Sequence, residues 1–143
     1  MKKERHTIPP ESAAKRMVGG WQISSFQDYA LRSLLQWMKD RHVPVVVHQL
    51  PVHPEVAQFV QHDPRFAQSY QDYCDYMDSL EPAPRAIFRS LDPAEFGGDA
   101  TSMADRTHLN EAGALLYSTQ LAEKIRPFMR RTPPPRGRSD GAK

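Results

Sequence analysis

The chain lacks the features of a disulfide-stapled or membrane-spanning protein. Its 143 residues include one cysteine, Cys74, which cannot form a disulfide within the chain, whereas small secreted domains commonly depend on such bridges. No apolar run approaches the roughly 20 residues of a membrane helix. The two lysines near the start have no apolar stretch behind them, unlike a signal peptide. We therefore expect a cytoplasmic protein without a membrane partner.

A strong charge of either sign is also lacking. The formal net charge is only +2, so no chain-wide field favours nucleic acid as a partner. The positive excess lies in MKKER at the start and in RPFMRRTPPPRGRSDGAK at the end. Nucleic-acid binding would rest on these scattered arginines alone, and we expect no nucleic-acid partner.

Three segments of different composition follow one another. Residues 1–22 are polar and contain a Pro-Pro and a Gly-Gly pair, which predicts an irregular N-terminal segment. Residues 23–130 carry the apolar periodicity and predict one domain, since a chain of this length has room for a single modest core. Residues 131–143 are basic and proline-rich and hold no core-forming side chains, which predicts a disordered tail.

The central segment opens with a helix that leads directly into a strand. Ser24 and Ser25 are suitable N-caps, and apolar residues recur every four positions behind them. The expected broad apolar face consists of Phe26, Ala30, Leu34 and Met38, flanked by Leu31 and Leu35. HVPVVVHQLP follows and is short, β-branched and almost continuously apolar. It predicts a strand over residues 43–50 that is buried on both faces, as in a parallel sheet.

The remaining elements complete an α/β pattern. Helices are predicted over residues 54–61 and 64–80, a weaker strand over 86–91, and a last helix from Asn110. The apolar face expected for the last helix consists of Ala112, Leu115, Leu116, Thr119, Ala122 and Ile125. A loop of about 18 residues precedes His108 and is long enough to suggest a function. The whole order predicts an α/β fold that is rich in helix and has few parallel strands.

The stretch MADRTHLNEAGALLY holds the most specific chemistry. Asp105 and His108 lie three residues apart at the entrance of the last helix. Around a turn this spacing lets the carboxylate reach the imidazole, as in a general base with its orienting carboxylate. A helix cap or a surface ion pair has the same spacing. A catalytic role requires a nucleophile beside the imidazole.

Three stretches resemble the C-terminal half of the SGNH/GDSL hydrolase family. ALRSLLQWMKDRHVPVVVHQLPVHP resembles the family's late helix and buried strand, IFRSLDPAEF its next strand and loop, and DRTHLNEAGALLYSTQLAEKI its last Asp-x-x-His block and closing helix. The resemblance covers roughly residues 25–126. It implies part of a doubly wound, flavodoxin-like three-layer sandwich, with Asp105 as orienting carboxylate and His108 as general base. HQLPVHP and HLNEAGALLYS are most similar to exported or membrane-anchored members that act on acyl groups of cell-envelope polymers. The resemblance implies an ester or acylated polymer as substrate, and it implies that a full-length relative is exported or membrane-anchored.

The nucleophile of that family is missing from this sequence. The chain contains neither Gly-Asp-Ser nor the oxyanion-hole blocks, and Ser24 and Ser25 are better explained as helix caps. An Asp–His pair without serine and oxyanion donors supplies little catalysis. The first hypothesis is therefore a truncated or split SGNH-like ester hydrolase or acyl-transfer protein that is inactive alone.

The second hypothesis is a non-catalytic interaction module that reuses the half-fold. A two-stranded sheet is marginal by itself, and the edge of VPVVV invites pairing with another chain. Both hypotheses predict a homo-oligomer or a complementary chain that supplies the missing strands.

Histidines provide the remaining candidate site residues. His48 and His53 are expected near the C-terminal end of the first strand, where α/β proteins bind ligands, and are predicted to contact substrate. Together with His42 and His62 they could suggest zinc, but they fall on different elements without cysteine or carboxylate at ligand spacing. We expect neither a metal nor a cofactor.

Overall fold

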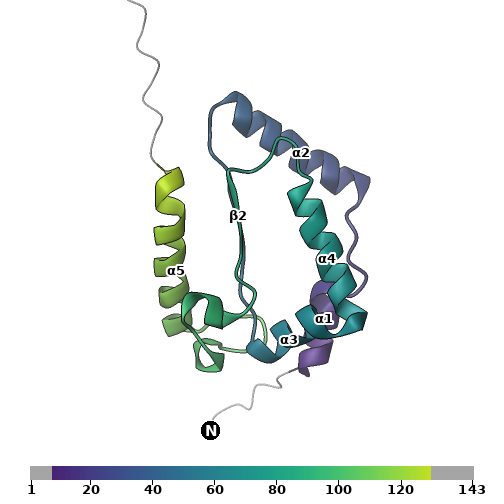
Figure 1. Ribbon diagram of the computed structural model, residues 1–143, viewed down its shortest axis with the longest axis vertical. Coiled ribbons are helices and arrows are strands. Elements are labelled where there is room, and N and C mark those ends of the chain that lie inside the picture. Colours follow the sequence, from purple (N-terminus) through teal and green to yellow (C-terminus); the bar gives the residue numbers. More distant parts are fainter. Residues whose placement is uncertain (1–7, 130–143) are drawn as a thin grey trace, which may run out of the picture.

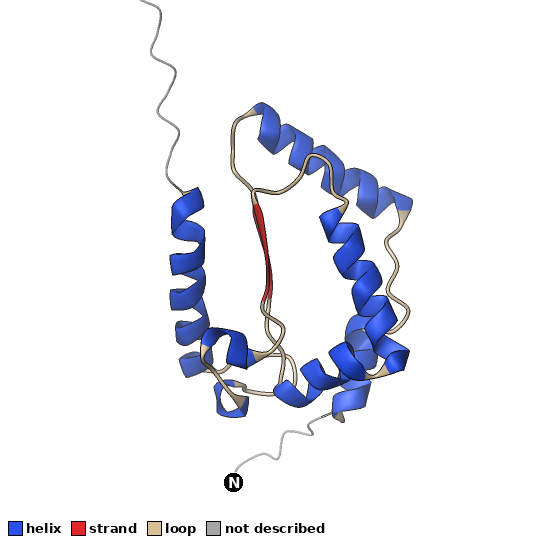
Figure 2. Ribbon diagram, viewed as in Figure 1, coloured by secondary structure: helices blue, strands red, loops and turns tan. Residues whose placement is uncertain are grey.

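Two short parallel strands lie at the centre of a helix-rich molecule (Figures 1 and 2). The structure is a computed structural model and describes residues 8–129. Strand β1 (Val46–Gln49) pairs with β2 (Ala86–Arg89) in parallel, with Val46 opposite Ala86. Within the described residues they form a two-stranded sheet. The predicted α/β class with few parallel strands is confirmed at this level.

Helices α3 (Pro54–His62) and α4 (Pro64–Asp78) connect the two strands. Each helix has a proline in its first turn, where the missing N–H is not needed. Asp63 ends α3 and begins α4, and its side chain accepts a hydrogen bond from the Arg65 backbone N–H. Prolines and one acidic cap thus divide the two helices close to the predicted positions.

Helix α2 (Ser25–Asp40) precedes β1 and begins with a capping box between Ser24 and Gln27. The predicted cap at Ser24 is confirmed, and the predicted apolar face is confirmed at its flank, Leu31 and Leu35, but is wrong for its central row. Leu35 is the buried residue, whereas Phe26 and Leu34 are 77% and 51% exposed. The helix carries apolar side chains on opposite sides, and periodicity alone does not select the side that contacts the sheet.

The two faces of the sheet have different neighbours. Side chains alternate along each strand, so Val47 and Ile87 share one face and His48 and Phe88 the other. The first face packs against α2 and α4 in a cluster formed by Leu31, Leu35, Val45, Val47, Tyr73, Tyr76, Met77, Leu80 and Ile87. The predicted burial of the strand on both faces is wrong, because His48 is exposed and its β1 neighbours are half-buried. In Figure 1, α5 lies on the opposite side of the strands from α4, and Tyr117 of α5 contacts His48 on this second face.

The largest core cluster lies where α1 (Pro10–Val18) meets α3 and α4. It consists of Ala13, Ala14, Val18, Val52, Val56, Ala57, Val60, Phe66 and Leu91. The expectation of an irregular segment over residues 1–22 is therefore wrong for α1. Small side chains at Ala13 and Ala14 let α1 approach α3 closely and bury completely, a tertiary effect that local composition does not show.

The chain after β2 forms two short 3₁₀ helices and then the last helix. These elements are η1 (Pro93–Phe96), η2 (Ala100–Ser102), α5 (Glu111–Ile125) and η3 (Arg126–Phe128). The face predicted for α5 is wrong: Gly113 and Tyr117 are its buried residues, and Leu115 is 71% exposed. No helix within residues 8–129 is both long and apolar enough to span a bilayer. The predicted tail at 131–143 lies outside the described residues.

Candidate functional site

Asp105 and His108 lie in a tight loop between η2 and α5. The loop is closed by an antiparallel bridge between Met103 and Leu109 and by a hydrogen bond from Ala104 N–H to the His108 carbonyl, at 2.8 Å. Asn110 then caps α5 by accepting a hydrogen bond from Gly113 N–H at 2.9 Å. The loop therefore has fixed ends, one in the bridge and one in the helix cap.

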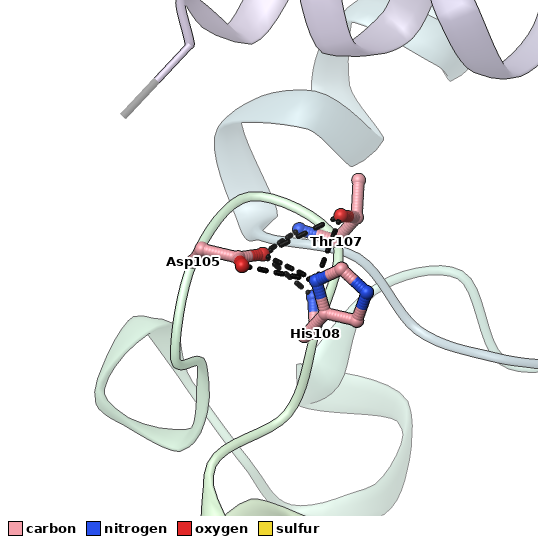
Figure 3. A network of polar contacts seen from close by, with 3 residues as sticks. All are labelled: Asp105, Thr107 and His108. Atoms are coloured by element: carbon pink, nitrogen blue, oxygen red, sulfur yellow. Dashed lines mark hydrogen bonds and ion pairs between the residues drawn. The ribbon is translucent and has the colours of Figure 1, made fainter. Parts of the chain in front are cut away.

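The side chains of Asp105 and His108 contact each other directly (Figure 3). His108 Nδ1 is 2.9 Å from each Asp105 carboxylate oxygen. Asp105 Oδ1 also accepts hydrogen bonds from the backbone N–H groups of Thr107, at 2.8 Å, and His108, at 2.9 Å. The Asp105 carboxylate thus closes the turn through Oδ1 and orients the His108 ring through both of its oxygens. The predicted pairing of these two residues has the geometry expected of an orienting carboxylate and its imidazole.

Hydrogen bonding keeps the Asp105 carboxylate ionised. The Thr107 N–H is the largest cause that lowers the pKa of Asp105 below its usual value, and the His108 contacts add to it against the opposing effect of partial burial. An ionised carboxylate only accepts hydrogen bonds, so the proton of neutral His108 lies on Nδ1. This leaves Nε2 with a free lone pair. The His108 side chain is 74% exposed, and no group in the described part of the chain bonds to Nε2.

Arg106, between the two residues of the pair, attaches the loop to the start of α3. Its carbonyl accepts a hydrogen bond from His53 N–H at 3.0 Å. Its guanidinium lies 3.0 Å from His53 Nδ1 and forms an ion pair with Glu55, and the side chain is only 19% exposed. Arg106 was missed at the sequence level, although a charged residue inside the Asp-x-x-His motif was a usable signal.

His53 is therefore brought near the loop but not into direct contact with the pair. Its Nδ1 accepts a hydrogen bond from Glu55 N–H at 3.3 Å, so the ring caps α3 as well as receiving Arg106. Within residues 8–129, no hydrogen bond or ion pair joins it to Asp105 or His108. The substrate contact expected for His53 stays a prediction.

His48 lies on the α5 face of the sheet and binds another residue that the sequence did not single out. The Tyr117 hydroxyl donates to the Gln49 carbonyl at 3.0 Å and is 3.0 Å from His48 Nδ1. Because the hydroxyl has one proton, His48 Nδ1 is the donor in the second bond. Burial raises the pKa of Tyr117, which keeps the phenol neutral. His48 and Tyr117 join β1 to α5, and the expected substrate contact of His48 stays a prediction.

A nucleophile for His108 is not among the side chains that contact it. The Thr107 hydroxyl is 3.2 Å from Nδ1, the nitrogen already held by Asp105, and so is not aligned with the free Nε2. Cys74 lies on α4, and burial raises the pKa of its thiol. Within the described residues, no group of three histidine, cysteine or acidic side chains could hold a metal ion. The site is an oriented base without a nucleophile in contact.

Comparison of the chain with protein-family models, curated proteins and solved structures found no match. The relation to SGNH/GDSL hydrolases therefore rests on the residues and their geometry and is a proposal.

Proposed function

We propose that Asp105 and His108 form the base half of an SGNH-like acyl-transfer or ester-hydrolysis centre. The nucleophile and the oxyanion donors come from a further segment or another chain. The observation that carries this proposal is the ring orientation: Nδ1 is held at 2.9 Å by the carboxylate, while Nε2 has no partner among residues 8–129 and the side chain is 74% exposed. A helix cap or an ordinary surface ion pair does not require one ring nitrogen to be held by the carboxylate and the other to be left accessible.

The proposed chemistry follows from the different roles of the two His108 nitrogens. His108 Nε2 takes the proton of an incoming hydroxyl as its oxygen attacks the acyl carbon of an ester. Asp105 stays ionised and stabilises the imidazolium that forms. The proton then passes from Nε2 to the leaving alkoxide, and a second round with water or an acceptor alcohol releases the acyl group. The oxyanion between these steps needs N–H donors that the assembled centre supplies.

The free edge of the sheet is the proposed place for the missing part. Residues 42–54, which include β1, contain no lysine, arginine, aspartate or glutamate, and such charges are a usual protection of strand edges. A two-stranded sheet is also below the size that is stable alone. Strands added beside β1 would extend the sheet toward the doubly wound three-layer sandwich expected from the resemblance.

Labelling with a fluorophosphonate probe, which reacts with activated serines, tests this function. The affinity-tagged chain is isolated under native conditions from its source cells, as wild type, His108→Ala or the matched control His62→Ala. We expect labelling of a serine outside residues 8–129 in the wild-type and His62→Ala assemblies, and its loss in His108→Ala. Labelling that is unchanged in His108→Ala contradicts the proposal, and so does an assembly without an activated serine.

A non-catalytic interaction module is the second candidate function. The exposed side of α2 favours it, because an apolar stripe of Phe26, Tyr29, Leu34 and Trp37 remains open there, each about half exposed or more. Such a stripe is typical of a contact surface. A native assembly that forms through α2 and contains no His108-dependent activity supports this candidate over the first.

A further inference from the structure

A cavity lies on the opposite side of β1 from Tyr117, between α1, α4 and the end of the strand. Its volume is about 170 Å³, and it opens to the surface. The lining residues are Met17, Val18, Trp21, Gln49, Tyr70 and Tyr73. A buried cavity of about 150 Å³ accommodates benzene in a well-studied protein, so this one has room for a single ring with a small substituent.

Aromatic side chains form most of the wall. The Trp21 ring meets Tyr73 edge to face at a centroid distance of 5.6 Å, and Tyr70 stacks with Tyr73 at 6.1 Å. A wall of neighbouring rings favours another aromatic ring over a flexible chain, because aromatic pairs gain attraction beyond their buried area. None of the lining side chains is formally charged at neutral pH, so a neutral ligand is favoured over an ion.

Gln49 is the lining residue with an amide side chain, beside the hydroxyl-bearing Tyr70 and Tyr73. The Tyr70 hydroxyl donates to Gln49 Oε1 at 3.2 Å and thereby fixes the amide. Burial raises the pKa of Tyr70 to about 12, so the phenol keeps its proton at neutral pH. No group in the described part of the chain accepts a hydrogen bond from Gln49 Nε2. Gln49 Nε2 is therefore available to donate a hydrogen bond to a ligand in the cavity.

We propose that this cavity binds a neutral, single-ring aromatic compound that bears a carbonyl oxygen. The ring packs against Trp21, Tyr70 and Tyr73, and the carbonyl accepts a hydrogen bond from Gln49 Nε2. The proposal does not depend on Asp105 or His108, so the His108→Ala variant binds the same ligand as the wild type.

Acetophenone is a suitable probe, and the chain's two tryptophans provide a signal and an internal control. Trp21 lines the cavity, whereas Trp37 lies on α2 with Arg41 over its ring at 4.0 Å. In ¹H–¹⁵N spectra, acetophenone should shift the Trp21 indole signal in a saturable way, with a Kd on the order of millimolar for so small a ligand. The Trp37 signal should remain unchanged. Equal, non-saturating shifts of both signals overturn the proposal.

Two comparisons test the assigned chemistry. Benzoate and 2-octanone should bind at least about tenfold more weakly than acetophenone, because one is charged and the other has no ring. Gln49→Leu should weaken acetophenone about fivefold, the usual effect of one hydrogen bond, and leave ethylbenzene unchanged. Tyr70→Phe, which preserves the cavity shape, should weaken acetophenone in the same direction. Tighter binding of 2-octanone than of acetophenone, or acetophenone binding by Gln49→Leu and Tyr70→Phe that is as tight as in the wild type, contradicts the proposal.

Discussion

At the scale of single residues, Asp105 holds the candidate site together. It accepts hydrogen bonds from two backbone N–H groups and from the His108 ring, so turn formation and ring orientation depend on one carboxylate. This dependence is local, since all partners lie within three residues. It explains why the Asp105–His108 contact could be predicted from the sequence alone.

The pH dependence of the loop follows from the lowered pKa of Asp105. A carboxyl group whose pKa is lower in the folded state contributes stability that is present above its unfolded value, about 3.9, and is lost as the pH falls through the folded value. We expect the Asp105 carboxyl ¹³C signal to titrate below pH 3.9, together with the Thr107 amide signal. Titration at or above the unfolded value contradicts the hydrogen-bonded geometry.

Arg106 is expected to position the loop on α3. Its partners Glu55 and His53 are more than 50 residues away in the sequence. Local sequence patterns therefore could not predict the contact between Arg106 and α3. Arg106→Ala should lower the free energy of unfolding by about 1.5–3 kcal/mol, the range for hydrogen bonds to charged groups. It should also speed amide exchange in residues 103–109, measured by NMR. The matched control Arg85→Ala, at an exposed position, should change neither quantity.

At the scale of elements, the sequence predicted the helices and strands better than the faces they bury. Their order and approximate bounds follow from caps, prolines and β-branched runs, which act locally. The buried faces of α2 and α5 depend on which neighbours are present, and both helices carry apolar side chains on more than one side. The short α1 was missed because its burial against α3 arises only in the folded chain.

Gly113 provides a test of how α5 contacts η2. In an exposed helix, glycine to alanine stabilises by about 1 kcal/mol. Here a Cβ would collide with the Ser102 carbonyl oxygen, so we expect Gly113→Ala to lower the free energy of unfolding instead. Ala122→Gly, on the exposed side of α5, should lower it by the helix-propensity difference alone. Urea unfolding measures both, and a stabilised Gly113→Ala variant refutes the close contact.

At the scale of the whole molecule, the described residues leave apolar surface and sheet edges uncovered. The α2 stripe predicts self-association of the purified chain at rising concentration, measured by sedimentation equilibrium. The double variant Phe26→Gln, Leu34→Gln should shift the population toward monomer, because both side chains are largely exposed. Its free energy of unfolding should change by no more than about 0.5 kcal/mol per substitution. A wild-type chain that stays monomeric at all concentrations contradicts this account of α2.

We propose that this chain supplies only the base half of an acyl-transfer centre. Turnover of p-nitrophenyl acetate tests this proposal most directly. The rate is compared between the purified chain and the native assembly, each as wild type and as His108→Ala. We expect no His108-dependent turnover by the purified chain. We also expect turnover by the wild-type assembly that falls at least about a thousandfold in His108→Ala, as when a triad base is removed. His108-dependent hydrolysis by the purified chain, or equal rates for the two assemblies, would contradict it.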